Sequence, residues 1–342
     1  SLANQFSRSN SLFFDSQLSV ETIQAACVAL GHSFRERIYS PAITVWMFVG
    51  QVLSSDQSCR DAVSRLNVWR VAHGMEPAST DTSSYVEARQ RLPEELLLGL
   101  ARSTGKDSVS RTHANWLWKN RVVKVVDGST LTMPDTPDNQ REYPQSKSQK
   151  PGVGFPIVRI VMIFALATGA ALEIALGKYA GKQVGETSLL RTLLSTILPG
   201  EILLADRYYA TFRLFAAAWQ NDFDLVCRAH HLRKIDFRSG IKLGVLDQIV
   251  SYPKPVQRPY WMTIEEYKAA PDFIFVRHLR YQVSQPGFRT RQIVVATTLL
   301  NSLEYTVDDI ANLYRQRWLI ETDIRSLKTH MKMEHLRCKS PA

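Results

Sequence analysis

Four residues in the last part of the sequence are of types and spacing that could do chemistry together. Tyr314, Arg317, Glu321 and Lys328 fall within a sector of about 60° when successive residues are turned by 100°, as on a helix. A carboxylate on such a face can hold a cation, and the basic and phenolic groups beside it can bind phosphates. For a single helix, the alternative explanation is a solvated charged face.

The helix that positions these residues is expected over residues 306–331. Thr306 as a hydroxyl cap and Asp308 in the first turn are typical of a helix start. A separate apolar stripe predicts that one side of the helix packs on a core. The stripe comprises Leu313, Ile320, Ile324, Leu327 and Met331.

The spacing Tyr314-x2-Arg317-x3-Glu321-x6-Lys328 resembles the YREK signature of DDE transposases of the insertion sequence 4 family, which are bacterial insertion-sequence enzymes. Further runs, spread over most of the chain, look like the same family. They are DGSTLTMPDTPDNQREYPQ, SQKPGVGFPIVRIVMIFALATGA, LLADRYY, PGFRTRQIVVATTL and LYRQRWLIETDIRSLKTHMKMEHLRCKSP. The resemblance implies that Glu321 acts with two aspartates on upstream strands.

Two aspartates come at the ends of short, buried-type strands. Asp127 follows the β-branched run at 122–126, and Asp206 follows the apolar run at 202–205. A carboxylate at the end of a buried strand costs free energy unless something pairs with it, although Asp before Gly is also common in turns. The elements from 122 to 228 follow the order strand, strand, strand, helix, strand, helix, strand. That order is typical of a ribonuclease H-like mixed sheet, in which the first and fourth strands are neighbours, so we expect Asp127 beside Asp206.

The composition favours a polyanionic partner. The formal net charge is +10 and the isoelectric point is about 9.5, which makes nucleic acid the first candidate and an anionic membrane surface the second. No apolar run approaches the roughly 20 residues of a membrane span, and no signal-peptide pattern is present. We therefore expect a cytoplasmic protein without membrane contact, and the resemblance implies that it is bacterial and associated with the nucleoid. The four cysteines lack metal-ligand spacing, which argues against a zinc site.

Changes in periodicity predict two domains, giving an α/β fold class with a helical addition. Residues 1–110 are expected to form an all-helical N-terminal domain, whose arginines either bind DNA ends or solvate the helix surfaces. Residues 119–342 are expected to form a ribonuclease H-like mixed-sheet catalytic domain. The stretch between Asp206 and Glu321 is too long for one usual connection, which predicts a β-rich insertion at about 230–287.

The carboxylates Asp127, Asp206 and Glu321 are predicted to be the catalytic residues and the ligands of two Mg²⁺ ions, with Mn²⁺ as an alternative. The pair His230-His231 is of the residue type for a metal or acid-base site, but the basic residues around it disfavour a cation and fit phosphate contacts better. Trp261 lies in the inserted region, where the resemblance implies a tryptophan that stacks on a flipped base. The predicted DNA-binding residues are Tyr314, Arg317, Lys328, Arg207, Arg233, Lys234 and Trp261.

The resemblance implies cut-and-paste transposition, in which a homodimer acts on double-stranded DNA at paired terminal inverted repeats. Such enzymes nick the element's end, attack the opposite strand through a DNA hairpin, reopen it and join the 3′ ends to target DNA. Members usually continue past the KSP segment with a helical dimerisation section, so that section is expected to be absent here. One alternative is a truncated, non-catalytic DNA-binding copy that inhibits a full-length transposase. Another is a ribonuclease H-like nuclease without strand joining.

Overall fold

The computed structural model describes residues 18–34, 37–150, 152–181, 183–260, 262–283, 291–325, 328–329 and 333–341. The chain divides into two compact units, residues 1–107 and residues 108–342. Each unit has its own apolar clusters and is described by itself. Within the described part of the chain, no helix is both long and apolar enough to span a bilayer.

The described part of the first unit is built from helices, and hydroxyl caps set the starts of α2, α3 and α4. The side chains of Ser19, Ser40 and Ser58 each accept a hydrogen bond from a backbone N–H three residues on. Apolar residues from three of these helices, including Ile23, Val45 and Leu96, pack into one cluster. The helices are α2 (Val20–Ala29), α3 (Pro41–Leu53), α4 (Cys59–Ala72), α5 (Ser83–Arg91) and α6 (Glu94–Ser110).

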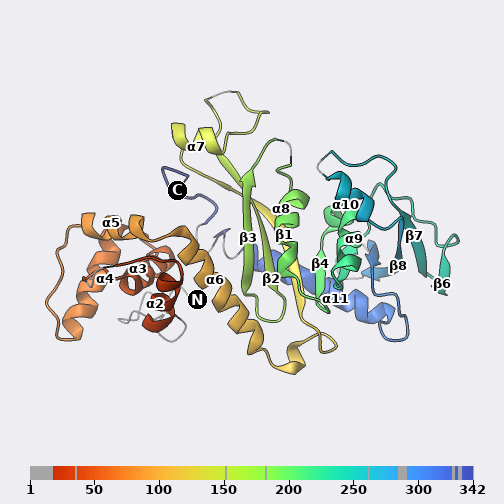
Figure 1. Ribbon diagram of the computed structural model, residues 1–342, viewed down its shortest axis with the longest axis horizontal. Coiled ribbons are helices and arrows are strands. Elements are labelled where there is room, and N and C mark those ends of the chain that lie inside the picture. Colours follow the sequence, from red (N-terminus) through yellow and green to blue (C-terminus); the bar gives the residue numbers. More distant parts are fainter. Residues whose placement is uncertain are drawn as a thin grey trace. The chain divides into compact units, whose positions relative to one another are not determined.

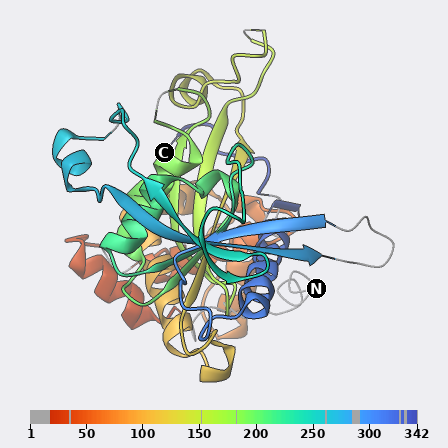
Figure 2. The same cartoon turned by 90° about the vertical axis from the view of Figure 1, so that its right-hand side faces the viewer.

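The second unit contains one mixed sheet of nine strands in the order β3-β2-β1-β4-β5-β9-β8-β7-β6. The pairs β1–β4 and β4–β5 are parallel and the other pairs are antiparallel. Accumulated twist turns the strands at one end of the sheet across the direction of those at the other end (Figure 2). The strands are β1 (Val123–Thr132), β2 (Ile157–Ala165), β3 (Ala171–Lys178), β4 (Ile202–Ala205), β5 (Asp224–Arg228), β6 (Ile241–Gly244), β7 (Asp247–Pro253), β8 (Phe273–Val283) and β9 (Arg291–Thr297).

Helices cover both faces of this sheet (Figure 1). Val126 packs in one core cluster with Leu190 of α8 and Phe215 of α9. Its neighbour Val125 packs in another cluster with Leu313 of α11, because successive strand residues point to opposite faces. The helices and 3₁₀ turns of this unit are η1 (Ala114–Trp116), α7 (Pro137–Glu142), α8 (Glu186–Leu193), η2 (Leu194–Thr196), η3 (Arg207–Tyr209), α9 (Phe212–Gln220), α10 (Ile264–Ala269) and α11 (Val307–Arg325).

The structure corrects the expectations for the chain around Asp127. Asp127, expected at the end of a strand, lies within β1, which continues to Thr132 and is followed by α7. Thr136 followed by proline is a capped helix start, and the prediction missed that signal.

The region expected as a β-rich insertion does contain strands, and they extend the main sheet. Residues 277–283 of β8 pair with β9, and β9 pairs with β5 of the first five strands. β7 and β6 then follow as the outermost strands. The bounds proposed for the insertion and for the two domains stay predictions.

Candidate active site

Asp127 and Asp206 come together through the register of two neighbouring strands. Asp127 lies in β1, and Asp206 directly follows β4. The parallel pairing sets Val125 beside Leu204, so two places further along Asp127 comes opposite Asp206. Adjacent strands are about 4.8 Å apart, which brings two oxygen-donor side chains within reach of one cation. The expectation that the first and fourth strands are neighbours is confirmed.

The carboxylate of Asp127 belongs to the face of the sheet that α11 covers. Strand alternation places Asp127 on the same face as Val125, which packs against α11 residues. Its Oδ1 accepts a hydrogen bond from the Gly128 N–H at 2.9 Å, which limits its rotation. Both aspartates are half-buried, so solvent and a ligand can reach them.

Tyr314 and Arg317 lie on α11 next to this pair of aspartates. Tyr314 is 6% exposed, and the Arg317 guanidinium lies 5.7 Å from the centre of its ring. Burial raises the pKa of Tyr314, the charge of Arg317 opposes that rise, and the negative charge of Asp206 adds to it. The Tyr314 hydroxyl therefore stays protonated at neutral pH and can donate a hydrogen bond beside Asp206.

Lys328 approaches the same face from the segment after α11. Its Nζ donates to the Oγ of Ser129 at 3.2 Å. Ser129 follows Asp127 by two residues on β1 and so shares its face of the sheet. The ammonium group of Lys328 is therefore close to the strand that carries Asp127.

The donors described here fit a hard divalent cation, because carboxylate oxygens are the ligands that Mg²⁺ prefers. Among the side chains that the structure describes, no group of three or more His, Cys, Asp and Glu is arranged to hold a metal ion. The backbone of Glu321 lies in α11, four residues after Arg317; its side chain is outside the described part. Trp261 also lies outside the described residues. The roles of both residues stay predictions.

The other predicted DNA-binding residues lie at two places. Arg207 follows Asp206 in η3, with its guanidinium 5.3 Å from the Tyr208 ring centre. Arg233 and Lys234 lie in the loop after β5, and the Arg233 guanidinium is 3.6 Å from the centre of the Tyr252 ring. The contact with Tyr252 holds Arg233 against β7. Lys234 is exposed.

Further positive charge gathers at Tyr281 of β8. Burial raises the pKa of Tyr281, and the charges of Arg315, Arg228 and Arg317 work against that rise. Arg228 ends β5 and Arg315 lies on α11. The sequence had not singled out either residue for DNA binding, and only the folded sheet brings them to Arg317.

The geometry also brings Glu186 and Tyr209 to the aspartates from the α8 side of the sheet. The negative charges of Glu186, Asp127 and Asp206 add to the effect of burial in raising the pKa of Tyr209. Neither Glu186 nor Tyr209 had been predicted as a site residue. The glycine after Asp127 is the sequence signal that could have pointed to a close neighbour there.

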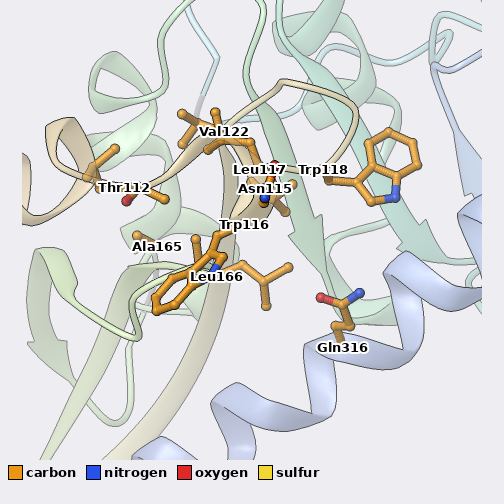
Figure 3. Close-up of a pocket in the computed structure, with 12 residues that line it drawn as sticks. Thr112, Asn115, Trp116, Leu117, Trp118, Val122, Ala165, Leu166 and Gln316 are labelled. Atoms are coloured by element: carbon orange, nitrogen blue, oxygen red, sulfur yellow. The ribbon is translucent and has the colours of Figure 1, made fainter.

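A cavity of about 360 Å³ opens at the start of β1, away from these residues. Trp116, Leu166 and Gln316 are among the side chains around it (Figure 3). None of the predicted site residues lines it. The candidate site is instead the place where β1 runs past the end of β4, and a partly exposed site of this kind suits a DNA backbone better than an enclosed pocket does.

Comparison with known proteins gives the family. The model of a family described as "Transposase DDE domain" matches residues 118–342. The transposase InsG of insertion sequence element IS4 from Escherichia coli (strain K12) is 23% identical over 317 residues, which are 90% of this chain and 66% of that protein. The putative transposase InsZ from the same organism is 26% identical over 199 residues, which are 57% of this chain and 63% of that protein.

This chain thus spans slightly less than two thirds of the length of these two relatives. The family model covers well over half of the 342 residues, including both aspartates and the whole of α11. The chain therefore belongs to the transposase DDE domain family, which confirms the resemblance to insertion sequence 4 transposases that its motifs indicated.

Proposed function

We propose that this chain is a transposase that cuts DNA at the ends of an insertion sequence and joins them to target DNA. The observation that carries the proposal is the parallel register of β1 and β4, which sets Asp127 opposite Asp206. Family membership and the net charge of +10 support it as well.

In this proposal Asp127 from β1 and Asp206 from the end of β4 would hold the divalent cation, and Glu321 would complete the set from α11. Bound Mg²⁺ would make a water or a 3′-hydroxyl a better nucleophile and would stabilise the departing oxygen. Arg317 and Lys328 bind phosphates of the DNA on either side of the cleaved bond. The protonated Tyr314 donates a hydrogen bond there and holds Arg317 in place.

The finer parts of the proposal concern the course of the reaction. A homodimer pairs the two ends, each end is cut through a hairpin, and the freed ends are inserted into the target. Residues 119–342 act as a ribonuclease H-like core, and the helices within residues 1–110 bind the terminal inverted repeats. Arg60 of α4 and Arg91 of α5 are exposed on the helices of the first unit, and such side chains are suited to phosphate contacts.

The test uses the full chain and linear DNA that carries the sequences flanking its own gene. In Mg²⁺, we expect double-strand breaks at imperfect inverted repeats, with hairpin intermediates on denaturing gels and joined products when target DNA is added. Asp127→Asn and Asp206→Asn should abolish cleavage and retain DNA binding. The matched control is Asp138→Asn, an exposed aspartate of α7 paired with Arg141, which should cleave normally.

Full cleavage by the Asp127→Asn protein would overturn the assignment. Binding to the ends without cleavage in Mg²⁺ or Mn²⁺ would favour a non-catalytic DNA-binding protein. Cleavage without joining would favour a nuclease.

A further inference from the structure

Gly128, the residue after Asp127, makes room for a carboxylate on the opposite face of β1. A Cβ atom at position 128 would lie 2.4 Å from Cδ and 2.8 Å from Oε1 of Glu186, distances that non-bonded atoms do not adopt. Glu186 is the first residue of α8, which covers the face opposite α11. The Asp127 carboxylate therefore lies on the α11 face of β1, and the Glu186 carboxylate packs against Gly128 on the α8 face.

Tyr209 adjoins this second carboxylate from the chain that follows Asp206. Its backbone N–H donates to the Asp206 carbonyl at 3.1 Å, and its side chain is 1% exposed. Among the described residues its hydroxyl makes no hydrogen bond of strict geometry, but the Glu186 carboxylate is close enough to accept one from it, and the charges of Asp127 and Asp206 also act on it. A buried hydroxyl that makes no hydrogen bond costs free energy. The Tyr209 hydroxyl is therefore a donor placed beside the Glu186 carboxylate.

We propose that Glu186 is an outer carboxylate of the cation site, seated by Gly128 and held by Tyr209, and that its negative charge strengthens divalent-cation binding by Asp127 and Asp206. The proposal rests on the proposed function, since it takes those two aspartates as the cation's ligands. We do not assign Glu186 as a direct ligand of the ion, because among the described side chains Asp127, Asp206 and Glu186 do not form a three-ligand group. It acts as a positioning residue through the electric field and through the backbone at Gly128, as outer residues of metal sites commonly do.

A direct measurement of Mn²⁺ binding to the full chain, without DNA, tests this inference. Titration followed by electron paramagnetic resonance gives the dissociation constant in the absence of any reaction. Glu186→Gln keeps the size of the side chain beside Gly128 but removes its charge. We expect it to weaken Mn²⁺ binding roughly tenfold, with a melting temperature in EDTA equal to that of the wild type.

Two further variants separate charge from packing. Tyr209→Phe removes only the hydroxyl, and we expect a smaller weakening of Mn²⁺ binding, about two- to threefold. The matched control is Gly177→Ala on β3, where a Cβ would lie 2.9 Å from a methyl group of Leu189. That change crowds the same helix α8 without moving a carboxylate, so Mn²⁺ binding should stay at the wild-type value.

The outcomes distinguish this inference from the proposed function. Wild-type Mn²⁺ affinity in the Glu186→Gln protein overturns the inference, and loss of affinity in Gly177→Ala equal to that in Glu186→Gln also overturns it. If Asp127→Asn and Asp206→Asn bind Mn²⁺ as the wild type does, the proposed cation site itself is wrong. Weak binding by the two aspartate variants together with normal binding by Glu186→Gln leaves the proposed function standing and rejects only Glu186.

Discussion

Asp247, in one half of the nine-stranded sheet, differs in burial and pairing from Asp127 and Asp206 in the other half. Asp247 of β7 is 5% exposed, and its carboxylate accepts hydrogen bonds at 2.7 and 2.5 Å from Arg277 of β8, which is fully buried. Asp127, within β1, and Asp206, just after β4, are half-buried. The first arrangement neutralises the charge inside the fold, and the second keeps carboxylates within reach of solvent. Residue type is the same, so burial and pairing decide which acid is structural.

The buried pair also helps to place the helix that adjoins the candidate site. Arg277 donates to the backbone carbonyl of Tyr305 at 2.6 Å, just before α11 begins at Val307. A second N–H of Arg277 is 3.4 Å from the Leu299 carbonyl. The outer half of the sheet thus anchors the start of α11, whose later turns carry Tyr314 and Arg317.

The largest expected effect comes from exchanging Asp for Asn in the two halves. Asp127→Asn should lower the rate of DNA cleavage by at least about a thousandfold, because it weakens the hold on the cation that stabilises the transition state. Its free energy of unfolding should stay near the wild-type value. Asp247→Asn should do the reverse, lowering stability while the remaining folded protein cleaves normally. Cleavage rates per folded molecule and urea unfolding curves measure both, and equal effects of the two changes would refute the comparison.

Arg277→Met comes next in size. It leaves the Asp247 carboxylate buried without its counter-charge, which should cost about 3–5 kcal/mol of unfolding free energy. The double variant Arg277→Met, Asp247→Leu should recover much of that loss, since no buried charge remains. Urea denaturation measures all three proteins. A loss below about 1 kcal/mol in the single variant would show that the pair is not the anchor of this half.

Acid should destabilise the outer half through His278 of β8. Its Nε2 is 2.6 Å from the Tyr252 hydroxyl, and burial, with a contribution from Arg233, lowers the pKa of His278 from 6.5 to about 4. Because the unfolded chain binds the proton more readily, stability is fully present above pH 6.5 and is lost as the pH falls towards 4. The loss should approach about 3 kcal/mol.

Unfolding in urea at pH 7.5 and pH 4.5 measures this change. In a His278→Gln protein the fall in stability between these pH values should be smaller by about that amount. An unchanged pH dependence in the variant would assign the effect to other groups.

The smallest expected effect is at Ser129. Ser129→Ala removes the hydroxyl that accepts from Lys328 at 3.2 Å, which should cost about 1 kcal/mol of positioning, or about a fivefold slower cleavage. Ser129→Thr keeps the acceptor and should cleave at nearly the wild-type rate. Single-turnover cleavage rates compare the three proteins. If Ala and Thr behave alike, the contact does not direct Lys328.

Local signals in the sequence predicted much of the secondary structure. Ser40 followed by Pro41 is a local signal of this kind for the helix at Pro41–Leu53, whose cap is the Ser40 side chain. The apolar run before Asp206 predicted β4. Such signals act over a few residues, so they can be read without knowing the rest of the chain. The missed helix α7 had the same kind of signal at Thr136 and Pro137.

The sequence by itself determined the family and the acids to be examined, because the YREK spacing and the strand-end aspartates are local patterns. Only the tertiary structure decided that Asp127 stands opposite Asp206, that Glu186 fills the space left by Gly128, and that Asp247 is neutralised by Arg277. These relations join residues far apart in the chain. They depend on strand register and side-chain packing, which arise when the whole sheet forms.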